Sequence, residues 1–209
     1  SQPVFLRRVK RLRCNKYCLL KNVPSSFQTP SERLMKIKIE DTRPEHVEQA
    51  QEVFYQTWLS TYPNEEAGIT VEDIEERWKV RNAPERLSRR KAELEKGDPN
   101  QKYIVATDEG KVIGVCVATK SDDVNRLNAI YVLPQYQGAG IGTMLWDEVK
   151  KFFDPSKDIV VGVATYNAAA IGFYTKLGFV DSGRRYTDER FKMKSGAMIP
   201  EMEMVIAAT

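Results

Sequence analysis

Three glycines at alternate positions, Gly138, Gly140 and Gly142, are the residues whose spacing first points to a particular chemistry. An apolar, β-branched run leads into them, and Pro134 ends that run because proline has no N–H for a central sheet ladder. An amphipathic run, 141–153, follows. A strand, a glycine loop and a helix in this order aim free backbone N–H groups at one point, where the helix dipole favours an anion. The residues predict a phosphate-binding loop.

The spacing of these glycines distinguishes among phosphate loops. A dinucleotide fold has G-x-G-x-x-G, but here the third glycine comes one residue early. A nucleoside-triphosphate loop has G-K-[ST], but Thr143 follows Gly142 with no lysine. The segment Gln137-x-x-Gly140-x-Gly142, preceded by I-Y-V-L-P, resembles the acetyl-CoA pyrophosphate loop of the GCN5-related N-acetyltransferase (GNAT) superfamily.

A second segment, 167–179, reads N-A-A-A-I-G-F-Y-T-K-L-G-F and is similar to the GNAT pattern N-x-x-A-x-x-F/L-Y-x-K-x-G-F. Asn167 is placed to cap a helix and Gly178 to end it. Asn167 and Tyr174 are almost two turns apart, so they are expected along one side of the helix, within reach of one extended ligand. The alternative is structural, with Asn167 only capping and Tyr174 only packing.

The resemblance covers about residues 35–207 and implies an α/β (α+β) GNAT fold. Its central sheet would be mixed, mostly antiparallel and of about six to seven strands flanked by helices. The implied function is transfer of the acetyl group of acetyl-CoA to a primary amine, on a small molecule such as a polyamine or on a peptide, by direct attack in a ternary complex. The alternative is a non-catalytic acyl-CoA-binding sensor or interaction module on the same fold.

The resemblance also implies the cofactor contacts. The loop would hold the pyrophosphate, the strand before it would pair with the pantetheine, and an N–H near Val132 would polarise the thioester oxygen. Tyr174, the one catalytic residue implied, would protonate the departing thiolate. The expected cofactor-binding residues are Ile130, Tyr131, Val132, Gln137, Gly138, Ala139, Gly140, Ile141, Gly142, Thr143, Asn167 and Tyr174.

The general base has no clear candidate in the sequence. Many relatives carry a glutamate on the fourth strand, but residues 126–130 contain no acid. Asn128 could position a water molecule but cannot itself take a proton. A carboxylate elsewhere, such as Glu65, or solvent through a water chain could serve.

The acceptor wall is expected between the first two helices, where GNAT proteins usually place it. Trp58, Tyr62 and Asn128 are the candidate substrate-binding residues, although large aromatics at helical spacing are mostly core residues. Acidic residues in 65–76 would suit a cationic amine, but a solvated helix face explains them equally well.

Composition sets the class of protein. The chain has 209 residues, 42% of them hydrophobic, a net charge of +3 and three cysteines. These values favour one domain with appendages, make nucleic acid an unlikely partner, and suggest reduced thiols in the cytoplasm.

No run reaches the ~20 apolar residues of a membrane span. A single histidine, His46, argues against a multi-histidine metal site. We expect no metal, and a homodimer is possible.

Residues 1–34 form a basic extension with no acid before Glu32, and the domain is expected at 35–209. Four interpretations compete. The extension could be a basic arm for nucleic acid or anionic lipid, a targeting leader, or half of a metal site through Cys14 and Cys18. It could also be a remnant of an expression sequence, or of translation that begins upstream of the natural start. We favour the remnant, because Met35 stands directly before the first periodic segment.

Periodicity and breakers predict the elements that position these residues. The first helix is expected to be capped by Asp41 or Thr42, and a right-handed crossover should make the strand at 159–164 parallel to the one before the loop. Strands are expected at 35–40, 103–106, 112–118, 126–132, 159–164, 180–187 and 202–207, and helices at 44–62, 71–80, 84–96, 141–153 and 167–178.

Overall fold

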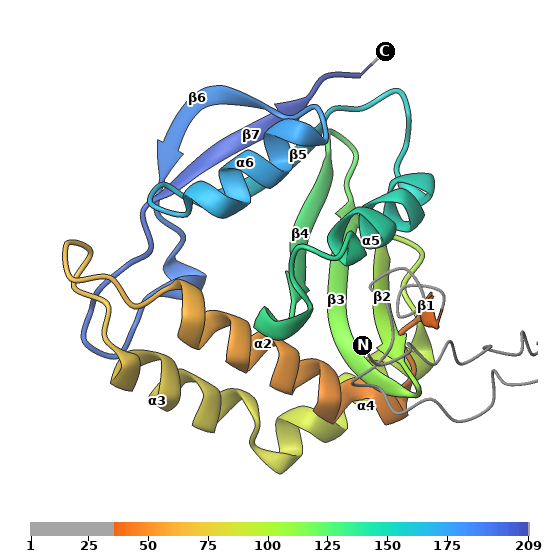
Figure 1. Ribbon diagram of the computed structural model, residues 1–209, viewed down its shortest axis with the longest axis horizontal. Helices are drawn as coiled ribbons and strands as arrows, with labels where there is room; N and C mark the ends of the chain where they lie inside the picture. Colours follow the sequence, from red (N-terminus) through yellow and green to blue (C-terminus); the bar gives the residue numbers. More distant parts are fainter. Residues whose placement is uncertain (1–35, 209) are drawn as a thin grey trace, which may run out of the picture.

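The computed structural model describes residues 36–208, so the extension expected at 1–34, with Cys14 and Cys18, lies outside the described residues. Seven strands form one sheet in the order β1-β2-β3-β4-β5-β7-β6, antiparallel except for β4 with β5 (Figure 1). The predicted mixed, mostly antiparallel sheet is confirmed. The strands are β1 (Ile37–Asp41), β2 (Gln101–Asp108), β3 (Lys111–Lys120), β4 (Asn125–Val132), β5 (Ile159–Ala164), β6 (Val180–Tyr186) and β7 (Glu201–Ile206).

Helices cover both faces of the sheet. Gly114 of β3 faces Leu145, because a Cβ built on it would lie 3.2 Å from the Leu145 side chain. Its neighbour Val115 points to the opposite face, since side chains alternate along a strand, and lines a cavity with Phe54. The helices are α2 (Val47–Thr61), α3 (Val71–Arg81), α4 (Pro84–Lys96), α5 (Ile141–Val149) and α6 (Ala168–Lys176). No helix in residues 36–208 has the length and apolar character to cross a membrane.

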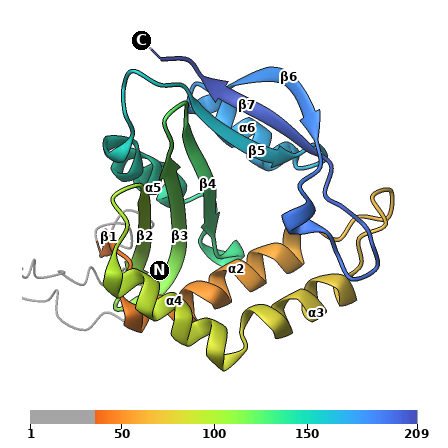
Figure 2. The ribbon, with the colours of Figure 1, turned by 180° about the vertical axis from the view of Figure 1, so that it is seen from behind.

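The parallel pair β4 and β5 is short. Only Asn125, Arg126 and Leu127 pair with β5, opposite 159–161. In both ribbon views the strands then move apart towards the end of β4 (Figure 2). The β5-facing edge of β4 therefore has no neighbouring strand over its second half.

A β-bulge lies where the two strands separate. Leu127 pairs with Ala118 and Ala129 with Val117, so Asn128 is the extra residue on β4. A bulged residue is unpaired and its side chain is re-aimed. Asn128 is accordingly exposed between two buried residues and lines the cavity beneath α2.

Two predicted element boundaries were wrong. The first helix is preceded by a 3₁₀ turn, Pro44–His46. Neither Asp41 nor Thr42 caps this turn; instead, His46 Nδ1 accepts from the Arg43 N–H at 3.2 Å. The helix expected over 141–153 ends at Val149 and tightens into the 3₁₀ turn Lys150–Phe152. Helix ends are often 3₁₀, and periodicity alone does not distinguish the two.

Gly162 of β5 tests how tightly the β5–β7–β6 half is packed. A Cβ there would collide with the Tyr186 hydroxyl and lie 3.0 Å from Glu201 Oε1. We expect Gly162→Ala to lower the free energy of unfolding by about 1–3 kcal/mol, and Tyr186→Phe in the same chain to restore part of it. Gly172→Ala is the control, because nothing lies within 4 Å of its added methyl, and it should stabilise helix α6 by about 0.5–1 kcal/mol. Urea unfolding measures the free energy of unfolding of Gly162→Ala, Tyr186→Phe, their double variant and Gly172→Ala. If the effects of Gly162→Ala and Tyr186→Phe simply add in the double variant, the assigned contact is contradicted.

Candidate active site

The glycine loop joins the end of β4 to α5 and presents free amides. Gly138 and Gly140 have φ of 76° and 83°, a left-handed conformation that glycine adopts without strain. Within residues 36–208 the N–H groups of 138–143 have no hydrogen-bond partner, and the first ladder bond runs from Met144 N to the Gly140 carbonyl at 3.1 Å. The Gln137 side chain donates to the Val132 carbonyl at 2.9 Å. The loop is thus tied to the strand while six amides stay available.

Gly142 has a packing role. A Cβ on it would lie 3.1 Å from the Phe173 ring, so its absence lets α5 approach α6. Asn167 caps α6, its Oδ1 accepting from the Ala170 N–H at 3.0 Å, as the sequence predicted. Ile141 is buried, and Ala139 and Thr143 are partly or fully exposed on the loop. The first turn of α5 therefore packs against α6 at Phe173, and Asn167 caps the start of that helix.

Tyr174 is buried in the main core, with its ring against Phe173 and Phe179 at centroid distances of 5.2 and 5.5 Å. Burial, with a smaller contribution from Tyr131, raises the pKa of Tyr174 well above its ordinary value. The phenol therefore stays protonated near neutral pH. The sequence predicted that Asn167 and Tyr174 lie along one side of the helix. In the structure Asn167 is half-buried at the helix cap, whereas Tyr174 faces the core, so the two agree with this prediction only in part.

Tyrosines cross the gap between β4 and the first helix. The hydroxyls of Tyr62 and Tyr131 share a hydrogen bond of 2.7 Å, and the Tyr166 hydroxyl donates to the Tyr62 carbonyl at 3.0 Å. Burial raises the pKa of both Tyr62 and Tyr131. Trp58 is buried against Tyr62, Trp78 and Phe191, so it is a core residue as well as a cavity wall.

One cavity of about 1010 Å³ reaches this region. Trp58, Asn128 and Tyr131 line it, whereas Tyr62 and Tyr174 do not. Cys116 also lines it, and burial raises the pKa of its thiol. The structure thus brings together two of the three predicted acceptor-wall residues with a residue of the predicted cofactor strand.

Glu201 is a buried ionisable residue near the tyrosines that the sequence did not single out, although it does not line the cavity. It begins β7, where it pairs with Ala164 at the end of β5, and is 9% exposed. Burial, and then the nearby Asp188, raise the pKa of Glu201 to about 7, although Arg190 and Arg126 oppose the shift. Its charge also raises the pKa values of Tyr62 and Tyr131, so it lies within electrostatic reach of both. No local motif marks it, because its surroundings come from β4, β5 and the segment after β6.

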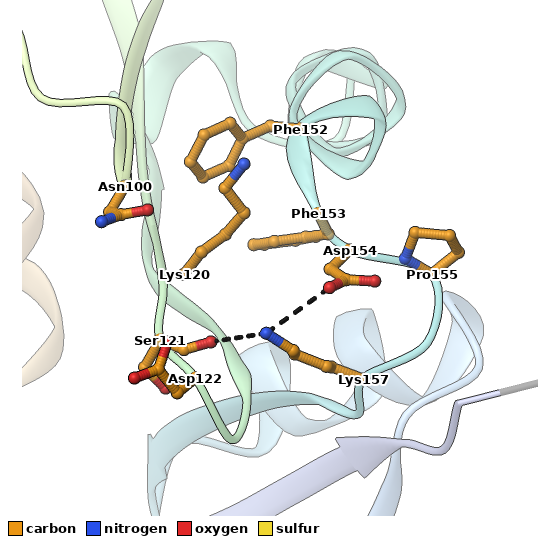
Figure 3. A pocket seen from close by; sticks show the side chains of 9 residues that line it. All are labelled: Asn100, Lys120, Ser121, Asp122, Phe152, Phe153, Asp154, Pro155 and Lys157. Atoms are coloured by element: carbon orange, nitrogen blue, oxygen red, sulfur yellow. Dashed lines mark hydrogen bonds and ion pairs between the residues drawn. The ribbon is translucent and has the colours of Figure 1, made fainter.

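A second hollow, of about 410 Å³, lies near the start of β4 (Figure 3). Its lysines are already engaged. Lys157 Nζ contacts the Ser121 carbonyl at 3.0 Å and Asp154 at 3.4 Å, and Lys120 Nζ lies 4.2 Å from the centre of the Phe152 ring. It is lined by none of the predicted site residues. Residues 36–208 hold no group of three or more His, Cys, Asp or Glu placed to bind a metal ion.

Comparison with known proteins agrees with this geometry. A family model described as the acetyltransferase (GNAT) family matches residues 54–179, more than half of the chain. The chain therefore belongs to the GNAT family of acetyltransferases.

Individual relatives are more distant. The peptidyl-lysine N-acetyltransferase YjaB of Salmonella typhimurium is 29% identical over 87 residues, 42% of this chain, so the chain matches about half (55%) of that relative's length. Among solved structures, the PaiA N-acetyltransferase of Thermoplasma acidophilum, in complex with coenzyme A, has a TM-score of 0.61 at 21% identity, covering 80% of this chain and 97% of its own. YncA of Salmonella typhimurium, solved with acetyl-CoA, has a TM-score of 0.51 at 19% identity, covering 83% and 95%. These structures establish the shared fold.

The raised pKa of Glu201 makes stability depend on pH. A carboxyl whose pKa rises from its ordinary 4.5 to about 7 on folding binds more proton in the folded state between these values. The free energy of unfolding must therefore fall as pH rises through this window. We expect Glu201→Gln to flatten that fall in urea unfolding at pH 4.5–7.5. The exposed Glu189→Gln is the control and should leave the slope unchanged. An equal slope in wild type and Glu201→Gln would contradict the assignment.

Proposed function

We propose that this protein is an N-acetyltransferase that moves the acetyl group of acetyl-CoA to a primary amine by direct attack in a ternary complex. The observation that carries the proposal is the run of six amides at 138–143 that have no hydrogen-bond partner among the described residues and that follow the end of β4 lacking a β5 neighbour. Family membership and the folds solved with coenzyme A and acetyl-CoA support it. Acetyl-CoA would supply the activated acetyl thioester.

The loop residues fit a diphosphate. Around Gly138 and Gly140 an added Cβ would meet nothing within 4 Å, so the space in front of the amides is open. Backbone N–H groups at the start of a nine-residue helix favour phosphate oxygens. The amides of Gly138, Ala139, Gly140, Ile141, Gly142 and Thr143 would bind the pyrophosphate, and Gln137 would hold the loop against Val132.

The free edge of β4 would hold the pantetheine arm. Ile130, Tyr131 and Val132 lie beyond the last residue that pairs with β5, and an extended ligand can add to such an edge as a strand does. An amide near Val132 would then polarise the thioester oxygen as a fixed dipole. Asn167, already engaged at its cap, would orient α6 beside the loop.

Tyr174 would act on the leaving sulfur. Its phenol keeps its proton because burial raises its pKa, so it can donate a hydrogen bond to the sulfur as the carbon–sulfur bond breaks. Cys116 is the only cysteine among the described residues, and its buried thiol has a raised pKa. A thiol that stays protonated is a poor nucleophile, which favours direct attack over an acetyl-cysteine intermediate.

Glu201 would serve as the general base that the fourth strand lacks. A carboxylate with a pKa of about 7 is matched to proton transfer near neutral pH. The amine nitrogen would bond to the acetyl carbon and give up its proton to Glu201, directly or through water held by Asn128. With this carboxylate available, the absence of an acid on β4 no longer favours a non-catalytic sensor.

The loop assignment predicts a specific loss of binding. Gly140→Val forces a β-branched residue into a left-handed conformation, which costs about 1–3 kcal/mol, and places its side chain before the amides. We expect coenzyme A affinity, measured by calorimetry, to fall at least about tenfold. Gly183→Val is the matched control, because Gly183 has the same φ, 83°, in β6, and an added Cβ there would meet nothing within 4 Å. Equal binding by wild type and Gly140→Val would reject the loop as the diphosphate site.

The catalytic assignment is tested by coenzyme A release with a panel of amines. We expect Tyr174→Phe and Glu201→Gln each to lower kcat by about 10²–10⁴-fold without loss of coenzyme A binding. Glu201→Gln should also remove an acid limb near pH 7 from the profile of kcat/KM. Tyr55→Phe, on a tyrosine stacked on Trp78 outside the cavity, is the control. Coenzyme A binding without turnover of any amine, unchanged by Tyr174→Phe, would instead favour the sensor.

A further inference from the structure

The large cavity extends well beyond the proposed thioester position. At one end lie Asn128, Ala129 and Tyr131 of β4. From there it runs along the faces of β2 and β3 beneath α2, α3 and α4, which lie together at one end of the sheet (Figures 1 and 2). Its volume of about 1010 Å³ is ample for a small molecule. An acceptor whose amine reaches Asn128 therefore has room for a further chemical group under these helices.

Two arginines in this cavity have no salt-bridge partner among the described residues, although the Arg81 guanidinium lies 5.4 Å from the centre of the Trp78 ring. Arg81, at the end of α3, and Arg90, in α4, both line it. Neither makes a salt bridge within residues 36–208, and Arg81 Nε and Arg90 Nη1 are buried without a hydrogen bond there. Gln51, 6% exposed, lines the same cavity, and its Oε1 is also unpartnered. Buried polar groups in proteins are normally satisfied, so three in one cavity point to a missing ligand.

The surrounding charges do not neutralise these arginines. Burial lowers the pKa of both, to about 10 for Arg90, and neighbouring arginines lower them further, although Glu93 opposes the shift of Arg90 and Tyr131 that of Arg81. The acids that line the cavity are Asp41, Glu93 and Asp98. Asp41 is paired with Lys102 and Glu93 with Arg89, and Asp98 bonds to the backbone of Asn100.

The acids near the acceptor region are also engaged or exposed. Asp73, in the first turn of α3, accepts from the N–H of its N-cap residue Thr70 and from the Ser195 hydroxyl, and Glu76 pairs with Lys79 and Lys194. The acidic surface in 65–76 that would have suited a cationic amine is therefore a solvated or structural one. Outside the described residues, Glu32 is the single side-chain acid of the chain. The chain itself offers Arg81 and Arg90 little to pair with.

We propose that the acceptor amine carries an anionic group of its own, a carboxylate or a phosphate, which Arg81 and Arg90 bind inside this cavity while the amine lies at Asn128. The proposal rests on the acetyltransferase function above and gives its substrate class. A guanidinium fork matches the oxygens of either anion. The anion would replace the lost hydration of two charges, and Gln51 Oε1 would accept from a donor group on the same ligand.

Matched amines test the selectivity. The pairs are 6-aminohexanoate with 6-aminohexanamide and O-phosphoethanolamine with ethanolamine, with cadaverine as the cationic case. We expect kcat/KM to favour the anionic member of at least one pair by tenfold or more. Arg81→Gln and Arg90→Gln should each abolish most of that preference and leave the neutral member unchanged. Arg89→Gln is the control, since Arg89 is exposed on the same helix and pairs with Glu93, and it should keep the preference.

Ligand-induced stabilisation tests the site without turnover. We expect 6-aminohexanoate, an anion without a phosphate group for the amides of 138–143, to raise the Tm of the wild type above that in sodium chloride of equal ionic strength. Arg89→Gln should behave likewise, and Arg90→Gln should show no such rise. Without ligand, Arg90→Gln should melt no lower than the wild type, because it removes a buried unpaired charge.

The two proposals fail in different ways. If neutral or cationic amines are acetylated as well as anionic ones, and the arginine variants match the wild type, the anion site is wrong and the acetyltransferase stands. If coenzyme A binds and no amine is consumed, yet anions raise Tm through Arg81 and Arg90, the anion site stands and the transfer function fails. If no anionic probe gives an arginine-dependent shift in Tm, the anion site is overturned.

Discussion

The separation of β4 from β5 after three paired residues is the constraint on which the rest of this structure depends. A strand edge inside a sheet needs partners for its backbone groups, and here β5 supplies none to the second half of β4. The crossover through α5 starts at that same end, so the free edge is followed directly by the open amides of 138–143. The proposed ligand, extended and with a diphosphate at one end, would use both.

The same separation allows polar groups to enter the core. The hydroxyls of Tyr62 and Tyr131 meet at 2.7 Å, and Tyr174 lies buried nearby with its charge influenced by Tyr131. Burial raises the pKa of all three, so they stay neutral donors near pH 7. Glu201 is the group here that changes charge near neutrality, with a pKa of about 7. Proton transfer at the centre would therefore pass through one carboxyl, while the phenols orient and donate.

Local patterns made the fold and half of the site predictable. The glycine loop, the Asn167 cap and all seven strands are marked by patterns in residues close in sequence, and the structure has them nearly as expected. Glu201 could not be found in that way, because its burial comes from strands far apart in the chain. Arg81 and Arg90 look like ordinary solvated charges on helices, and only the cavity beneath α3 and α4 shows that Arg81 Nε and Arg90 Nη1 are buried without a hydrogen bond among the described residues. The role of Asn128 likewise depends on a bulge that sequence alone does not reveal.

The placement of charge around the acceptor follows from a conflict between two tasks. Binding an anionic tail requires guanidinium groups, yet each further guanidinium close to Glu201 would add to the lowering of its pKa by Arg190 and Arg126 and weaken it as a base. The structure keeps Arg81 and Arg90 apart from Glu201. The charges that act on Glu201 are Asp188, Arg190 and Arg126, whereas Arg81 and Arg90 are not among them. The arginines stand on α3 and α4 and the carboxyl on β7, at the other side of the separated strands. An acceptor long enough to reach from one to the other is the shape of molecule that this division of charge favours.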